Sequence, residues 1–302
     1  MKMILKKLKK AFKKPKLIIL VLLSNEKIAS VFSDKLYLKI KYRLIMGKSL
    51  NLKNPQTFNE KLQWLKLHDR NPEYTKMVDK YEVRKYIEEK IGEEYLIPLL
   101  GVWDNPDDID FDSLPNQFVL KCNHNSGLGM CICKDKSSLD IKKVKKELKK
   151  GLKQNYFITS REWPYKNVKP RVIAEKYMVD ESGKELKDYK FLCFGGVPKY
   201  IEVHSGRFSG KHTQDIYDHE WKKTDISQDG LMSKVTIAKP IKLEEMIQLS
   251  ELLAKDISHV RVDWYLINDR IYFGEITFFD GSGFEPFDDY SHDSFLGSLI
   301  KI

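Results

Sequence analysis

The spacing of apolar residues predicts a mainly helical segment over residues 25–100. Phe58, Leu62 and Leu65 follow one another at the interval of a single helical face, and residues 81–91 repeat that interval. Beyond this segment the pattern changes to short apolar runs framed by proline, glycine and aspartate, which is typical of strands. Helices therefore come first and strands follow.

The second part of the chain alternates strands with two helices. Residues 118–121 and 130–133 flank a loop with glycines and predict a β-hairpin. Residues 139–156 place apolar side chains on one side and lysines on the other, which predicts an amphipathic helix. A second helix is expected over residues 243–256, strands over residues 171–178, 189–194 and 197–203, and a last hairpin over residues 260–278. Because helices and antiparallel strands mix without strict βαβ alternation, the predicted fold class is α+β, in one or two lobes.

The composition describes a globular protein. Of 302 residues, 42% are hydrophobic and 12% aromatic, which excludes a disordered polymer. The net charge of +10 comes largely from residues 1–16, which hold eight lysines and no acid. This charge favours acidic partners such as nucleotide phosphates, anionic polymers or lipid head groups. Nucleic acid is disfavoured, because neither zinc or helix-turn-helix spacing nor interleaved aromatic and basic residues accompany the charge.

The N-terminus and the cysteines bear on location. The apolar run of residues 17–23 is too short to cross a bilayer, which needs about 20 residues. A basic arm over residues 1–24 that rests on anionic membrane is one interpretation, and a solvated or self-packed helical extension is the other. Four cysteines are too few for a disulfide framework in this length, so reduced thiols and a cytoplasmic location are expected. The cysteines are Cys122, Cys131, Cys133 and Cys193.

The first candidate site is the loop over residues 123–129, which follows Lys121 at the end of a predicted strand. Gly127 and Gly129 permit positive φ and let backbone N–H groups approach an anion, while the lysine supplies a charge for phosphate. The loop lacks the Gly-Lys-Ser/Thr ending of a Walker A motif. A simple hairpin loop is the alternative interpretation.

The second candidate site is the last hairpin, in which the register decides whether two acids meet. A two-residue loop would send Asp263 and Glu275 to opposite faces, whereas a three-residue loop over residues 268–270 pairs them. The longer loop also pairs Arg261 with Thr277. It gathers Val262, Trp264, Leu266, Tyr272 and Ile276 on the other face. Such a polar face can hold Mg²⁺ against phosphates, and a surface hairpin with cross-strand ion pairs is the alternative.

Two further segments carry weaker signals. The strand over residues 171–178 contains Glu175, and a carboxylate at a strand end is usually solvated. Residues 203–212 are polar and rich in glycine, and their Arg207 and Lys211 either clamp an acidic substrate or decorate an exposed loop. Zinc is not expected, because the spacing of His124, His204, His212 and His219 does not specify it.

The order of these pieces resembles the ATP-grasp enzymes, and within them the amidoligases similar to the teichuronopeptide-biosynthesis protein of bacterial surface polymers. The phrase Asn-Pro-Gln-Thr-Phe-Asn-Glu-Lys-Leu-Gln-Trp over residues 54–64 is similar to the N-terminal signature of that group. The likeness runs from about Leu50 to the C-terminus. It implies an ATP-grasp fold with a helical region over residues 25–115, a small lobe over 116–180 and a large lobe over 181–302.

The resemblance also implies roles for the candidate residues. Lys121 would reach the α-phosphate region of ATP, the glycine loop would cover the β- and γ-phosphates, and Glu175 would accept from the adenine amino group. The implied nucleotide-binding residues are Lys121, Asn123, Ser126, Gly127, Gly129, Glu175, Lys176, Met178 and Asp188. The implied Mg²⁺ ligands are Asp263, Glu275 and Thr277, and the implied catalytic cations are Arg261, Lys190 and Arg207.

The chain departs from the family pattern at one place. Many ATP-grasp enzymes have asparagine two residues after the metal-bridging glutamate, whereas this chain has Thr277, whose hydroxyl is a poorer magnesium ligand. Residues 278–284 replace the usual Pro-Gly that follows. The number of metal ions therefore stays open.

The activity that the resemblance implies is a ligation. MgATP would activate a carboxylate as an acyl phosphate, and an amine would then attack it. The expected acceptor is a sugar or uronic acid of a capsular or other surface glycan, joined to an amino acid or amine. Three alternatives are a kinase on the same scaffold, a nucleotide-sugar glycosyltransferase and a non-catalytic binding module. The glycosyltransferase ranks low because the only Asp-x-Asp run, over residues 108–112, lies in a turn-rich linker, and the acids of the last hairpin speak against a non-catalytic module.

Overall fold

The structure, a computed structural model, describes residues 15–180, 186–206 and 212–302, and these build two antiparallel sheets. The four-stranded sheet has the order β1-β4-β2-β3 and the five-stranded sheet the order β7-β6-β5-β8-β9. The strands are β1 (Leu99–Trp103), β2 (Phe118–Cys122), β3 (Cys131–Cys133), β4 (Val172–Lys176), β5 (Asp188–Phe194), β6 (Val197–Ser205), β7 (Thr213–Asp218), β8 (His259–Ile267) and β9 (Arg270–Thr277). Both predicted hairpins and the α+β class are confirmed.

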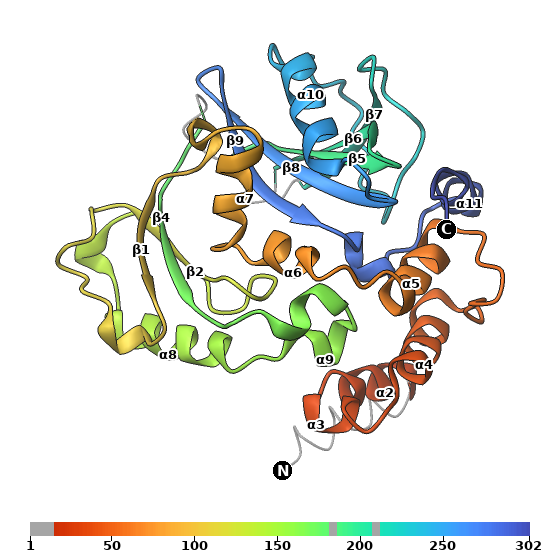
Figure 1. Cartoon of the computed structure of the whole chain (residues 1–302), viewed down its shortest axis with the longest axis horizontal. Coiled ribbons are helices and arrows are strands. Elements are labelled where there is room, and N and C mark those ends of the chain that lie inside the picture. Colours follow the sequence, from red (N-terminus) through yellow and green to blue (C-terminus); the bar gives the residue numbers. More distant parts are fainter. Residues whose placement is uncertain (1–14, 181–185, 207–211) are drawn as a thin grey trace.

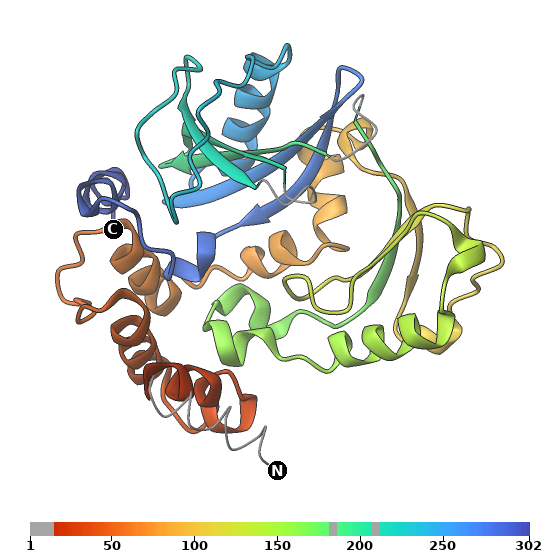
Figure 2. The same cartoon turned by 180° about the vertical axis from the view of Figure 1, so that it is seen from behind.

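Helices precede, connect and cover the sheets. The α-helices are α2 (Pro15–Leu23), α3 (Glu26–Ala29), α4 (Asp34–Met46), α5 (Phe58–His68), α6 (Glu73–Val78), α7 (Val83–Lys90), α8 (Ile141–Leu152), α9 (Tyr156–Ser160), α10 (Leu243–Ala254) and α11 (Tyr290–Leu299). Short 3₁₀ helices are η1 (Glu93–Tyr95), η2 (Pro106–Asp108), η3 (Lys136–Ser138), η4 (Trp163–Asn167) and η5 (Asp280–Gly283). Figures 1 and 2 show α6 and α7 between the two sheets.

Two helix predictions can be compared in detail. The predicted helix after Asn54-Pro55 is α5, which begins with a capping box formed by Thr57 and Glu60. The amphipathic helix predicted over residues 139–156 is confirmed as α8, but it ends at Leu152, and a separate short helix, α9, begins at Tyr156. The side chain of Asn155 accepts from the Ile158 N–H and starts the second helix.

Alternation along the strands gives the five-stranded sheet two different faces. Phe191, Val262 and Trp264 are fully buried and belong to a core shared with α10. The indole N–H of Trp264 donates to Ser250 Oγ of that helix at 2.8 Å. Because successive side chains on a strand point to opposite faces, Lys190, Arg261 and Asp263 lie on the face away from α10. The core thus fixes the sheet that presents the polar candidates.

The last hairpin has the predicted pairing for a different reason. Its turn has two residues, Asn268 and Asp269, both with positive φ (48° and 61°), so the predicted three-residue loop is wrong. The register shifts between Asp263 and Trp264, where a β-bulge at Gly274 adds one residue to β9. Asp263 therefore pairs with Glu275, and Arg261 with Thr277, as predicted.

The bulge also changes the apolar face of this hairpin. Val262, Trp264 and Ile276 are buried as predicted, but Phe273 lies opposite Trp264. Tyr272 pairs with Tyr265 and does not share the apolar face, so its prediction is wrong. Because Gly274 is an extra residue in β9, the β9 residues between it and the turn pair with β8 one position away from the predicted register.

The first helices form a separate apolar cluster along the lower edge of Figures 1 and 2. Tyr37 of α4 anchors them, because its hydroxyl donates to the carbonyls of Leu23 and Thr159 at 3.1 and 2.8 Å. Several apolar side chains of α2 and the residues after it stay exposed, among them Val21 (65%) and Val31 (81%). In the described part of the chain, no helix combines the length and apolarity needed to span a membrane.

Candidate functional site

A cavity of about 720 Å³ lies over the polar face of the five-stranded sheet. Its walls come from β5, β6, β8 and β9, from the loop that follows β9, and from α9 and η4. Lys80, between α6 and α7, and Ser126, in the glycine loop, complete the wall from outside that sheet. Segments far apart in the sequence thus meet at one place.

Asp263 of β8 is almost completely buried and is not part of the cavity wall. The Arg261 guanidinium donates to both carboxylate oxygens of Asp263, from Nε to Oδ1 at 2.7 Å and from Nη2 to Oδ2 at 2.8 Å. The Lys190 ammonium lies 2.5 Å from the same Oδ2. Burial acts to lower the pKa of Arg261, but Asp263 and Asp280 hold it well above its ordinary value. Two cations therefore stay charged around one carboxylate.

Glu275 lies beside this group and opens toward the cavity, with 39% of its side chain exposed. Its Oε1 accepts from Arg261 Nη2 at 3.2 Å and from the Thr277 hydroxyl at 3.3 Å. Lys80 approaches Oε2 at 3.8 Å. Enclosure acts to raise the pKa of Glu275, but Lys80, Arg261 and Lys190 lower it to about 2. This carboxylate is ionised at any physiological pH.

The loop after β9 adds a third acid. Arg261 Nη1 donates to Oδ1 of Asp280, the first residue of η5. Lys66 of α5 holds the same loop, since its ammonium donates to the carbonyl and hydroxyl oxygens of Ser282 at 2.8 and 2.9 Å. The helical region therefore holds the loop that carries Asp280 through α5.

A second cluster lies on the four-stranded sheet. Lys121 of β2 is 2.6 Å from Glu175 of β4, and Arg84 of α7 is 3.9 Å from the other oxygen of that carboxylate. A small recess is lined by these three residues, by Gly274 and by Lys80. Lys80 lines the large cavity as well, so it connects the two clusters.

The loop residues separate into two groups. Ser126 lines the cavity, whereas Asn123 is fully buried and not part of its wall. The Asn123 amide donates to Asp79 and to the carbonyl of Lys169 at 2.7 and 3.0 Å, and its Oδ1 accepts from the Arg171 N–H at 2.7 Å. This residue ties β2 to its neighbours, so the structure does not bring its side chain to the site.

The two glycines of the loop differ in their surroundings. Gly127 has a φ of 82° with open space where a side chain would be, whereas Gly129 has a φ of 73° and packs against Cys122 and Gly151. A Cβ at Gly129 would lie 2.9 Å from the Cys122 sulfur. Gly129 therefore fits the loop against α8, and Gly127 supplies only a turn conformation.

The remaining predicted residues lie at varying distances from the cavity. Lys176 has an exposed side chain, and its N–H donates to the carbonyl of Pro98 at 3.0 Å, so this N–H is engaged within the protein. Met178 follows the end of β4. Asp188 is buried at the start of β5, opposite His204 of β6 and Tyr265 of β8. Arg207 and Lys211 lie outside the described residues.

Sequence reasoning missed Lys80, Asp280 and a chain of side chains from Glu202 through His204 to His212. Lys80 stands in a helical region with no motif around it, so its role follows only from the packing of α6 and α7 between the sheets. Asp280 belongs to the stretch that departs from the family pattern. Glu202 and His204 alternate with apolar residues on β6. This alternation predicts that both side chains lie on one polar face of the strand, so the sequence contained a signal for them.

The donor set fits magnesium. Asp263, Glu275 and Thr277 offer carboxylate and hydroxyl oxygens, the hard ligands that Mg²⁺ prefers, and this ion usually takes one or two protein carboxylates with phosphates and waters completing its shell. Among the described residues no group of three His, Cys, Asp or Glu side chains is arranged to hold a metal alone. The site thus suits an ion that arrives with a phosphate ligand.

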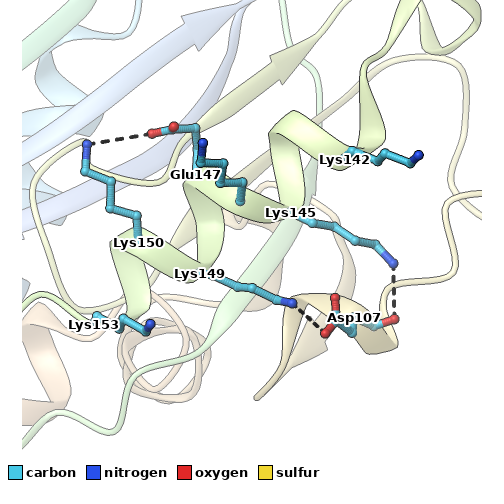
Figure 3. Close-up of a pocket in the computed structure, with 8 residues that line it drawn as sticks. Asp107, Lys142, Lys145, Glu147, Lys149, Lys150 and Lys153 are labelled. Carbon is cyan, nitrogen blue, oxygen red and sulfur yellow. Dashed lines mark hydrogen bonds and ion pairs between the residues drawn. The ribbon is translucent and has the colours of Figure 1, made fainter.

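A lysine-rich surface on α8 shares no residue with this cavity. Figure 3 shows Lys149 and Lys145 reaching toward Asp107, with the ammonium groups 2.6 Å from Oδ2 and 3.2 Å from the carbonyl oxygen. Lys150 lies 4.0 Å from Glu147. The other basic side chains on this surface are Lys142, Lys146 and Lys153. The surface therefore carries a clear excess of positive charge.

A family model described as TupA-like ATPgrasp matches residues 60–301. Comparison with curated proteins finds no match. Among solved structures, D-alanine-D-alanine ligase from Helicobacter pylori is similar, with 16% identity over 81% of this chain and 69% of that one, at a TM-score of 0.44.

Two other solved structures are similar at the same level. D-alanine-D-alanine ligase from Bacillus anthracis, complexed with ATP, has 18% identity, and the alignment covers 67% of this chain and 53% of that one at a TM-score of 0.40. D-cycloserine synthetase DcsG has 15% identity, 75% and 71% coverage and a TM-score of 0.41. This chain therefore spans about half of the Bacillus enzyme.

Proposed function

Because the chain belongs to the TupA-like ATP-grasp family and is thus an ATP-dependent ligase, we propose that it joins a carboxylate to an amine through an acyl phosphate. The observation that carries this proposal is an ion-pair cluster at one cavity: Glu275, Arg261, Lys190 and Lys80 line its wall, and the buried Asp263 pairs with Lys190 and Arg261. Phosphoryl transfer needs alignment and charge neutralisation more than covalent chemistry from the protein. This cluster provides both signs of charge at fixed positions.

We assign the acidic residues of the site to Mg²⁺ binding and the basic residues to stabilisation of phosphoryl charge. Asp263, Glu275 and Thr277 would hold Mg²⁺, which supplies charge neutralisation at the phosphates of ATP when it is bound. Asp263 and Asp280 hold Arg261 in one orientation, and its guanidinium would face the transferring phosphoryl group when ATP is bound. Lys190, which pairs with Asp263, and Lys80, which approaches Glu275, add positive charge at the same cavity. These groups would stabilise the charge that builds up when a substrate carboxylate attacks the γ-phosphorus.

The nucleotide base has a second set of candidates. Lys121, Glu175 and Arg84 form an ion-pair cluster on the four-stranded sheet, next to the recess that reaches Lys80. We assign Lys121 to the α-phosphate side and Glu175 to the adenine amino group. Met178, the carbonyl of Lys176 and the nearby Asp188 are secondary candidates for the same cleft. The glycine loop, with Ser126, Gly127 and Gly129, would cover the phosphates and keep water from the acyl phosphate.

The substrates follow from charge and family alone. The acceptor carboxylate would be a sugar or uronic acid of a bacterial capsule or surface polysaccharide, and the nucleophile an amino acid or amine. Arg207 is proposed to contact the acidic acceptor. The alternative is a kinase that phosphorylates a glycan hydroxyl at the same site, since both reactions begin with transfer of the γ-phosphoryl group. A glycosyltransferase has no support from the cavity residues.

The proposed place of work is the cytoplasmic face of the plasma membrane. Residues 1–16 carry eight lysines without an acid, and exposed apolar side chains of α2 follow directly. Basic residues beside an exposed apolar face are typical of helices that lie on anionic membranes. The lysine-rich surface of α8 lies along the same lower edge of Figures 1 and 2 and extends the positive charge.

The experiment is a screen for ADP and phosphate release with MgATP against uronic acids, each combined with amines or amino acids. A ligase releases ADP and free phosphate only when both substrates are present, and hydroxylamine converts its acyl phosphate to a hydroxamate. A kinase instead transfers phosphate to the glycan and releases none. Asp263→Ala and Glu275→Ala should fold and lack ATP turnover, and wild-type turnover in both variants would overturn the assignment.

A further inference from the structure

The segment from α9 to η4 contributes three side chains to the cavity wall that the proposed reaction does not use. Tyr156 is the first residue of α9, and Tyr165 belongs to η4. Glu162 lies between these helices in the chain and is only 3% exposed. Two phenols and a buried carboxylate therefore form one wall of the cavity that holds the ion-pair cluster.

Glu162 and Tyr156 hold Tyr165 in place. The carbonyl of Glu162 accepts from the Tyr165 N–H at 3.2 Å, and its Oε1 accepts from the Tyr156 hydroxyl at 3.2 Å. The two tyrosine rings meet edge to face, with their centroids 4.8 Å apart, a favourable geometry for aromatic pairs. Backbone and ring contacts therefore fix Tyr165 without the use of its hydroxyl.

The Tyr165 hydroxyl differs in this respect from its neighbour. The Tyr156 hydroxyl donates to Glu162, whereas in the part of the chain that the structure describes the Tyr165 hydroxyl has no hydrogen-bond partner. Tyr165 is half-buried and lines the cavity. Because a tyrosine hydroxyl that leaves bulk water usually finds a partner, this one indicates an acceptor that arrives with a ligand.

Tyr165 keeps its proton at neutral pH. A phenol ordinarily loses its proton near pH 10, and burial together with the charges of Glu162 and Glu275 holds the pKa of Tyr165 well above its ordinary value. Arg261 acts in the opposite direction. These influences also mean that Tyr165 lies within electrostatic range of the ion-pair cluster. It is a neutral donor at the cavity of the proposed phosphoryl transfer.

The second step of the proposed ligation needs a donor of this kind. When an amine adds to an acyl phosphate, the carbonyl oxygen becomes an oxyanion, and a donor aimed at that oxygen lowers the barrier. Arg261 and Lys190 are engaged with Asp263, and in the proposed function they serve the phosphoryl group. The Tyr165 hydroxyl has neither commitment.

We propose that the Tyr165 hydroxyl donates to the carbonyl oxygen of the acyl phosphate and stabilises the oxyanion that forms there when the amine attacks. This inference rests on the proposed ligase function. The lone pair of the neutral amine forms the C–N bond, and the π electrons of the carbonyl move to its oxygen. The carbonyl then re-forms, the bond between the acyl carbon and the phosphate oxygen breaks, and phosphate leaves with that electron pair. One proton of the attacking nitrogen goes to the phosphate, which departs as hydrogen phosphate, while Tyr165 keeps its own.

The assignment also orients the carboxylate substrate. One carboxylate oxygen would attack the γ-phosphorus on the side of Arg261, and the other would accept from Tyr165. A reacting hydroxyl group has a single oxygen, which the phosphoryl group takes, so it leaves the Tyr165 hydroxyl without an acceptor at the reacting atom. A catalytic role for Tyr165 thus separates a ligase from a kinase at this site.

The test measures the two steps separately, with D-glucuronic acid as the carboxylate and ethanolamine as the amine. Isotope exchange in ATP that carries ¹⁸O at the β,γ-bridging position, measured with D-glucuronic acid alone, reports acyl phosphate formation. Amide formation reports both steps together. We expect Tyr165→Phe to lower kcat for amide formation by about 100-fold, as for removal of an oxyanion donor. Isotope exchange should stay within about threefold of wild type, because the first step does not use the hydroxyl.

The matched control is Tyr290→Phe, the same change at an exposed tyrosine of α11, which should leave both rates unchanged. Wild-type amide formation in Tyr165→Phe, or equal losses of amide formation and isotope exchange, would overturn the assignment and leave the ligase intact. If wild-type protein releases no ADP with any carboxylate of the screen, or transfers phosphate to the glycan, the ligase function fails. The Tyr165 assignment then fails with it.

Fluorine nuclear magnetic resonance of protein that contains 3-fluorotyrosine supplies a measurement without turnover. The resonance that disappears in Tyr165→Phe should shift when D-glucuronic acid and MgADP are added, because the hydroxyl gains an acceptor. The resonance that disappears in Tyr290→Phe should not move. A Tyr165 resonance that stays constant at a D-glucuronic acid concentration that saturates isotope exchange would overturn the assignment.

Discussion

Lys190 and Asp263 lie opposite each other on neighbouring strands, with the ammonium nitrogen 2.5 Å from the carboxylate oxygen Oδ2. Both side chains are almost completely buried. Burial and the nearby Arg261 act to lower the pKa of Lys190, yet Asp263, Asp188 and Glu275 together raise it. The charge of Lys190 therefore depends on the acids around it, and Lys190 and Arg261 share the carboxylate of Asp263.

The first prediction concerns that carboxylate. Asp263→Asn keeps the size of the side chain but removes the charge that holds Lys190 and Arg261, so we expect ATP turnover to fall at least about 100-fold. Stability should fall by up to about 3 kcal/mol, because two buried cations lose their partner. Steady-state ADP release and urea unfolding measure the two effects. Asp269→Asn, the same change in the turn of that hairpin, should alter neither, and comparable turnover in both variants would contradict the assignment.

The second prediction concerns Lys80, which lines both the cavity and the recess beside Lys121. Lys80→Met keeps the length of the side chain and removes its charge, so the KM for ATP should rise about 10-fold or more while the fold persists. Lys76→Met, an exposed position on α6 paired with Glu73, is the control. An unchanged KM in Lys80→Met would remove this lysine from the nucleotide site.

The hairpin of β8 and β9 could be predicted only in part from the sequence. The sequence left two registers open, and the one that pairs Asp263 with Glu275 and Arg261 with Thr277 is confirmed. The predicted loop was wrong, because asparagine and aspartate at positive φ make a two-residue turn and the extra residue sits at Gly274 instead. The bulge shifts the alternation of buried residues in β9, which runs through Ile271 and Phe273 and then Ile276, but this shift alone does not show which register the partner strand takes.

The other misses have a similar cause. Asn123 was predicted at the phosphates because it follows Lys121, yet its amide group is used by Asp79, Lys169 and Arg171. Lys80 was not predicted at all. Both depend on how α6 and α7 pack between two sheets, which is a property of long-range contacts. Local pattern predicted the strands and the polar face, whereas the contents of the cavity required the tertiary structure.

The third prediction uses the bulge. A Cβ at Gly274 would lie 3.0 Å from the carbonyl oxygen of Asp263 and 3.2 Å from the Tyr265 ring. Gly274→Val should therefore push β9 away from β8 and misplace Glu275, with a drop in ATP turnover of at least about 10-fold. Thermal unfolding should report a loss of about 1–3 kcal/mol. Turnover at the wild-type rate would show that the bulge does not position Glu275.

The fourth prediction is a pH dependence. The pKa of Glu275 is about 2 in the folded protein, below its ordinary value of 4.5. A lowered carboxyl pKa contributes stability that is fully present above pH 4.5 and is lost as the pH falls toward 2. Glu275→Gln should therefore lose less stability than wild type between pH 4.5 and pH 3, as measured by urea midpoints. Glu88→Gln, exposed on α7, should follow the wild-type curve, and parallel curves for all three proteins would contradict the low pKa.

The fifth prediction tests the membrane surface. Leu17, Val21 and Leu22 of α2 are 52%, 65% and 47% exposed, next to a lysine-rich sequence that has no acid to repel anionic lipid. Replacing all three with serine removes apolar area that would otherwise enter the head-group region, at roughly 25 cal/mol per Å² buried. Wild-type protein should sediment with phosphatidylglycerol vesicles. The variant should bind the same vesicles at least about 10-fold more weakly. Neither protein should bind phosphatidylcholine vesicles, because the lysines need an anionic surface.

A control variant replaces the exposed Ile241 and Leu252 with serine, since these residues lie far from α2 in the sequence. Equal binding by the variant and this control would assign α2 to packing or solvent and leave the lysines as the sole attraction.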